Sequence, residues 1–97
     1  MQWPPENLEE LLHRAGDVLR EEGAREVYVF GSAAAGRLQE SSDVDLAVTG
    51  LPARRFIPAM GRVREIFNRP VDLVELTDDT PFTRYLKTEE GELLRVA

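Results

Sequence analysis

The chain has 97 residues and contains no cysteine, one histidine and one lysine, Lys87. Without cysteine there can be no disulfide and no cysteine-based metal or thiol chemistry. No apolar run approaches the roughly 18 residues that a membrane span needs. Residues 1–6 have neither the basic nor the apolar stretch of a signal peptide. We therefore expect a cytoplasmic protein with no membrane contact, folded by packing alone.

Acidic residues outnumber basic ones by 18 to 12, so the formal net charge is −6. An acidic domain is repelled by a phosphate backbone, which disfavours nucleic acid as a general partner. One basic segment, residues 54–69, contrasts with this background: it holds five arginines and a single acid, Glu65. Contact with a triphosphate or an acidic partner is one interpretation. A solvated helix face with local ion pairs is the other, and we weight it more heavily.

Apolar periodicity predicts the order of the elements. Helical spacing begins at Leu8 and stops near Gly23, and a small-residue loop occupies 31–36. Alternating or β-branched stretches predict strands at 26–30, 43–48 and 71–76. Helical spacing returns at 56–67, although Pro58 and Gly61 weaken it, and again from Phe82 to Leu93.

These elements predict a two-layer α/β (α+β) fold, in which helices pack on a small sheet of about three strands. About a dozen residues join the first two predicted strands, which is short for a parallel crossover, so we expect a mixed or antiparallel sheet. A length of 97 residues suits one domain, spanning 1–97.

Gly31 and Ser32 follow the first predicted strand directly. Glycine lets the backbone approach a ligand closely, and serine offers a hydroxyl and a backbone N–H. The alanines that follow could begin a helical turn, whose free N–H groups attract phosphate. We therefore expect Gly31 and Ser32 to bind the terminal phosphates of a nucleoside triphosphate.

Three aspartates complete the pattern. Asp43 and Asp45 lie two residues apart on one predicted strand, so their side chains point the same way, and Asp72 lies on another strand. Unpaired carboxylates are costly within such apolar strands. Magnesium prefers oxygen ligands, and three carboxylates can hold two ions for an in-line displacement. Glu75 is a rival third ligand of opposite parity to Asp72, and the sequence leaves the choice open.

The string from Val27 to Val48, with Phe30-Gly31-Ser32 and, ten residues on, Asp43-Val44-Asp45-Leu46, resembles the DNA polymerase beta-like nucleotidyltransferase superfamily. Its small size is similar to the minimal nucleotidyltransferase (MNT) branch. Residues 71–74 resemble the segment that carries that family's third acid, and residues 84–91 resemble its final helix.

The resemblance implies a nucleotidyltransferase fold and a Mg²⁺-dependent transfer of AMP from ATP. Asp43, Asp45 and Asp72 are implied as catalytic and metal-binding residues, and Gly31 and Ser32 as nucleotide-binding residues. The family often has an arginine where this chain has Ala35, which puts turnover and nucleotide affinity in question. Arg37 lies nearby and is the candidate substitute for nucleotide binding.

The resemblance also implies a partner, since the chain has no room for an acceptor-binding domain. MNT proteins resemble the antitoxin half of toxin–antitoxin pairs, in which AMP is added to a tyrosine hydroxyl of a HEPN ribonuclease toxin. Two alternatives stay open: a non-catalytic module that neutralises its partner by occlusion, and, more weakly, transfer to a small molecule. The nucleotide preference and any self-association are left open too.

Overall fold

The computed structural model describes residues 8–34 and 43–97. Its helices are α1 (Leu8–Glu21), α2 (Gly31–Ala34), α3 (Phe56–Phe67) and α4 (Pro81–Leu86), with 3-10 turns at Ala53–Arg55 and Glu89–Gly91. Its strands are β1 (Glu26–Phe30), β2 (Val44–Thr49), β3 (Val71–Glu75) and β4 (Leu94–Arg95). None of these helices is long and apolar enough to cross a membrane.

The described strands form one mixed sheet in the order β3-β2-β1-β4. β1 is antiparallel to both β2 and β4, whereas β2 and β3 are parallel. The predicted α/β class and the mixed sheet are confirmed, but the sheet has four described strands rather than about three. The additional strand is β4, only two residues long.

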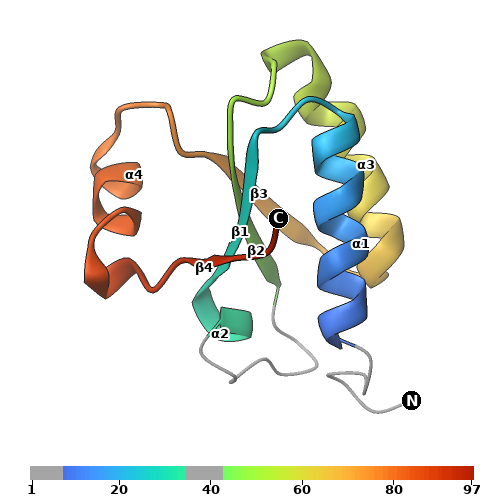
Figure 1. The fold of residues 1–97 in the computed structure, drawn as a ribbon, viewed down its shortest axis with the longest axis horizontal. Coiled ribbons are helices and arrows are strands. Elements are labelled where there is room, and N and C mark those ends of the chain that lie inside the picture. The colour runs from blue at the N-terminus through green and yellow to red at the C-terminus, as the bar shows by residue number, and fades with distance from the viewer. Residues whose placement is uncertain (1–7, 35–42) are drawn as a thin grey trace.

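Helices α1 and α3 cover one face of the sheet, and α4 lies on the other side (Figure 1). The first face holds the main core, in which Leu19 of α1 and Val63 of α3 meet strand residues such as Leu46, all with no exposed surface. A smaller cluster on the second face joins Phe30, Ala47, Leu76 and Leu86. Successive side chains of β2 point to opposite faces of the sheet, so Leu46 is buried in the main core and Ala47 in the smaller cluster.

Local chemistry sets the ends of the helices. α1 is followed by Gly23, which has a positive φ of 119° and donates its N–H to the carbonyl of Arg20 at 3.0 Å. α3 ends at Phe67, and the residue that caps it, Asn68, is left-handed with φ 54°. Pro58 does not break α3 because it lies in the first turn, where its missing N–H would have had no helical partner.

The predicted final helix is too long. Helix α4 begins with a capping box between Thr80 and Thr83 but ends at Leu86. Gly91 then packs against the backbone of Leu86, and Glu92 is left-handed with φ 53°. The chain turns back at that point, so Leu93 returns toward the sheet instead of continuing a helix.

Candidate active site

The strand register places two of the predicted acids side by side. Asp45 of β2 is paired with Phe30 of antiparallel β1 on one side and with Asp72 of parallel β3 on the other. Residues in register on neighbouring strands point to the same face, so these three side chains form one row across the sheet. They lie on the face that α1 and α3 leave open.

Asp45 is half-buried, and its charge is unfavourable there. Burial raises the pKa of Asp45 to about 6, and the charge of Asp72, a side-chain hydrogen bond with Asp72 and the charge of Asp43 all act in the same direction. Asp72 and Asp43 therefore both lie near enough to Asp45 to disfavour its charged form, and Asp72 has the larger effect. Such a cluster of carboxylates favours either a shared proton or a bound cation.

The acids differ in exposure, which corrects one premise of the sequence argument. Asp43 and Asp72 are exposed, and Asp45 alone of the three is even half-buried. Asp43 directly precedes β2, and Asp72 lies on β3, an edge strand of the described sheet. Asp43 and Asp72 are therefore open to solvent, where a large ligand can reach them, whereas Asp45 lies on an inner strand.

Gly31 lies directly against the side chain of Asp45. Its φ of 69° is left-handed, and a Cβ on Gly31 would collide with the Asp45 carboxylate. Glycine is therefore required here for both backbone conformation and space. Ser32, half-buried, follows it in the short helix α2. Arg37, like Ala35, lies outside the described residues.

Glu75, the rival third acid, has a structural role instead. Its carboxylate accepts hydrogen bonds from the backbone N–H groups of Gly50 at 3.1 Å, Leu51 at 2.7 Å and Thr77 at 3.1 Å. The Thr77 hydroxyl donates a fourth at 2.9 Å. Because these donors use the carboxylate at the far end of β3, Glu75 is not part of the acid row.

The acid row offers the donor atoms that Mg²⁺ prefers. Across residues 8–34 and 43–97, no group of three or more His, Cys, Asp or Glu side chains is arranged to hold a metal ion by itself. Magnesium does not need such a cage in a nucleotide site, because one or two carboxylates and the substrate's phosphates suffice. The neighbouring carboxylates of Asp45 and Asp72 fit that requirement.

Two of the five arginines in residues 54–69 form ion pairs with acids at the end of α1. Arg55 pairs with Glu22 at 3.3 Å, and Arg62 pairs with Glu21 at 3.2 Å and Glu22 at 3.7 Å. These contacts agree with the local ion-pair interpretation. Their contribution to stability is small where the side chains are exposed.

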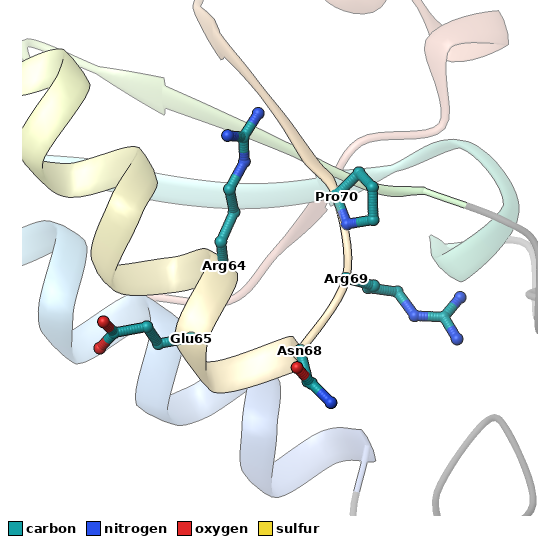
Figure 2. Close-up of a pocket in the computed structure, with 5 residues that line it drawn as sticks. All are labelled: Arg64, Glu65, Asn68, Arg69 and Pro70. Carbon is teal, nitrogen blue, oxygen red and sulfur yellow. The ribbon is translucent and has the colours of Figure 1, made fainter.

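A hollow of about 450 Å³ lies where α3 meets β3, lined by Arg64, Glu65, Asn68, Arg69 and Pro70. Figure 2 shows that the side chains of Arg64 and Arg69 point in different directions. They do not converge on one anion, so this hollow is a weaker phosphate site than the Gly31–Ser32 turn.

A second hollow, of about 290 Å³, adjoins Gly31 and Ser32 and was not foreseen from the sequence. Phe82 and Tyr85 of α4 line it and are 49% and 52% exposed. The helical spacing of Phe82, Tyr85 and Leu86 was visible, but it could not tell which of them faces the core.

Fold and acid row together define a nucleotidyltransferase-type α/β domain, and comparison with known proteins identifies the family. The family described as "Polymerase beta, Nucleotidyltransferase" matches residues 13–95. The chain therefore belongs to the polymerase beta nucleotidyltransferase family. The comparison with curated proteins returned no match.

Solved structures agree with this assignment. A minimal nucleotidyltransferase is 26% identical, with a TM-score of 0.75 and 92% of each chain covered. A toxin–antitoxin structure with AMP-PNP contains a chain that is 21% identical, with a TM-score of 0.70, covering 92% of this chain and 72% of that one. A mutant of the toxin–antitoxin MntA–HpeT has a TM-score of 0.70 at 18% identity, covering 89% and 71%. The resemblance to the MNT branch is confirmed.

Proposed function

We propose that the chain is a Mg²⁺-dependent nucleotidyltransferase that moves a nucleoside monophosphate, AMP from ATP, onto a hydroxyl of a partner protein. Asp43, Asp45 and Asp72 are the catalytic and metal-binding residues. Gly31 and Ser32 bind the β- and γ-phosphates. Arg37 is an additional nucleotide-binding residue in this proposal, standing in for the family arginine that Ala35 replaces.

The pairing of Asp45 with Asp72 across parallel strands, beside the left-handed Gly31, carries this proposal. Burial and the neighbouring Asp72 carboxylate both raise the pKa of Asp45, so its charge destabilises the protein unless a cation or proton joins the pair. A fold stabilised by packing has no need of such a pair. A nucleotide site does need it, because Mg²⁺ and triphosphate must be bound together.

The chemistry follows from these positions. Bound Mg²⁺ would neutralise charge on the phosphates and polarise the α-phosphorus for attack. The acceptor hydroxyl forms a bond to that phosphorus, its proton leaves to the carboxylate row, and the bond to the β-phosphate oxygen breaks. In this proposal pyrophosphate departs on the side of Gly31 and Ser32, whose N–H groups and hydroxyl can donate hydrogen bonds to it.

We propose a HEPN ribonuclease toxin as the partner and a tyrosine hydroxyl of that toxin as the acceptor, which makes the chain an antitoxin. Likeness to chains from toxin–antitoxin structures supports a toxin partner.

Labelled transfer tests the proposal. The purified chain is incubated with Mg²⁺ and α-phosphate-labelled ATP in a lysate of its source cells. An Asp43→Asn/Asp45→Asn variant is run beside it, with Asp17→Asn, an exposed acid of α1, as the matched control. We expect one labelled protein band with wild type and Asp17→Asn, absent from the double variant. A band that persists in the double variant contradicts the site.

The same assay separates the occlusion alternative. If no protein is labelled, and the double variant still neutralises a toxin in cells, the chain acts by binding alone. If label appears on a small molecule instead of a protein, the acceptor class is wrong while the chemistry stands.

A further inference from the structure

The hollow beside Gly31 and Ser32 has two facing walls. Phe30, at the end of β1, and the Gly31–Ser32 turn form one wall. Helix α4, through Phe82 and Tyr85, and the turn at Glu90 to Glu92 form the other. Its volume of about 290 Å³ is near the lower end of the range for small-molecule sites. It suits a planar ring system rather than a folded segment of a partner.

Both aromatic side chains of the α4 wall are held in place. The Tyr85 hydroxyl donates a hydrogen bond to the carbonyl of Glu90 at 3.1 Å. The Phe82 ring meets Phe30 edge to face, with centroids 5.9 Å apart and an interplanar angle of 64°. Rigid aromatic rings that are nevertheless half exposed offer a face for stacking without a large ordering cost on binding.

Charge decides which part of a ligand can lie in this hollow. Its charged lining residues, within the described chain, are Glu90 and Glu92. Carboxylates repel phosphate, so the triphosphate has to stay at the Gly31–Ser32 end. They accept hydrogen bonds, and ribose hydroxyls and the exocyclic amines of bases are donors.

Position argues against the acceptor as the occupant. In an in-line displacement the attacking and leaving oxygens lie on opposite sides of the phosphorus. The hollow adjoins Gly31 and Ser32, the proposed side of the leaving pyrophosphate, and none of the three aspartates lines it. The attacking hydroxyl therefore has to arrive from elsewhere.

We propose that this hollow binds the nucleobase and ribose of the nucleotide, with Tyr85 as the stacking residue. The inference rests on the proposed function, because it takes the phosphates to be bound at Gly31 and Ser32. Stacking on an aromatic side chain is tolerant of base identity. The acceptors on Glu90 and Glu92 add a preference for bases that carry an exocyclic amine.

Calorimetric binding of two ligands tests the inference. One is Mg²⁺ with α,β-methylene-ATP, which cannot release pyrophosphate, and the other is Mg²⁺ with inorganic triphosphate, which has no base. The variants are Tyr85→Ala, Tyr85→Phe, which keeps the ring, and Ile57→Ala, which removes an exposed side chain of α3. Thermal unfolding of each variant checks that it is folded.

We expect Tyr85→Ala to weaken binding of the nucleotide analogue about tenfold, in line with the usual effect of losing one stacking contact with a base. Triphosphate binding should stay within about twofold, and Tyr85→Phe and Ile57→Ala should resemble wild type. Unchanged analogue affinity in Tyr85→Ala, or an equal loss for both ligands, would overturn the inference while leaving the proposed function intact. Failure of wild type to bind either ligand would overturn both.

Discussion

One face of the sheet is covered by α1 and α3, whereas α4 lies on the other side (Figure 1). On that second side Phe30 is buried, Asp45 beside it is half-buried, and Asp72 at the end of the row is exposed. Consecutive residues of β2 belong to these two environments. Leu46 is fully buried in the main core, and Asp45 is half-buried among other acids. The covered face stabilises the fold, and the open face carries chemistry that stability alone would not select.

The largest expected difference is between those two neighbours. Leu46→Ala should lower the free energy of unfolding by about 2–5 kcal/mol, because it removes a fully buried side chain and leaves a cavity. Asp45→Asn should raise it by about 1 kcal/mol at pH 8 without Mg²⁺, because it removes a charge repelled by Asp72, with solvent screening keeping the gain small. Urea unfolding measures both. Destabilisation by Asp45→Asn would mean that the acid row is structural.

A second contrast lies within β3. Glu75→Gln should lower the free energy of unfolding by about 1–3 kcal/mol, because an amide cannot replace a carboxylate that accepts four hydrogen bonds. Nucleotidyl transfer per folded molecule should be unchanged, whereas Asp72→Asn should reduce it with little cost in stability. The pair is compared by urea unfolding and by labelled transfer. A specific loss of transfer in Glu75→Gln would return Glu75 to the candidate site.

Two glycines sharpen the comparison further. Gly31→Ala should destabilise by about 1–2 kcal/mol, since alanine disfavours the left-handed φ and its Cβ meets the Asp45 carboxylate. Gly61→Ala is the matched control in α3, where a Cβ would meet nothing within 4 Å, and should stabilise by about 0.5–1 kcal/mol. Thermal unfolding reports both signs. Equal effects would show that the Gly31 turn is not under this constraint.

The smallest expected effect is a pH slope. Because the folded pKa of Asp45, about 6, lies above its ordinary value of 3.8, the folded state binds more protons between them. The free energy of unfolding should therefore decrease as the pH rises from about 4 to 6 without Mg²⁺, against the trend from other carboxylates. Subtracting the profile of Asp45→Asn from that of wild type isolates this contribution. A difference that increases with pH would contradict the assigned direction.

Local pattern predicted most of the fold. The strand at 26–30 matches β1, and the helix at 56–67 matches α3. In both, the spacing of apolar residues in the sequence follows directly from which side of the element is buried. The stretch after Leu86 was misread because Leu93 fits both a helix and a strand. What ends α4 is the contact of Gly91 with the Leu86 backbone and the left-handed Glu92, which spacing does not encode.

The site was predictable in its residue types but not in its geometry. The spacing of Asp43 and Asp45 predicted that both lie on one face, although Asp43 directly precedes β2. The choice between Asp72 and Glu75 needed the register of β2 against β3, a contact between distant segments. The exposure of Asp43 and Asp72 and the hollow beside Tyr85 likewise depend on which elements pack together.

The most direct test of the central claim is thermal unfolding of wild type and Asp45→Asn, each with and without Mg²⁺ and α,β-methylene-ATP. A ligand that binds the folded state at 100 times its dissociation constant adds about 2.7 kcal/mol of stability. We predict a rise in Tm for wild type that requires both Mg²⁺ and nucleotide and is lost in Asp45→Asn. An equal rise in both proteins, or none in wild type, would contradict the claim that the open face binds a magnesium–nucleotide complex.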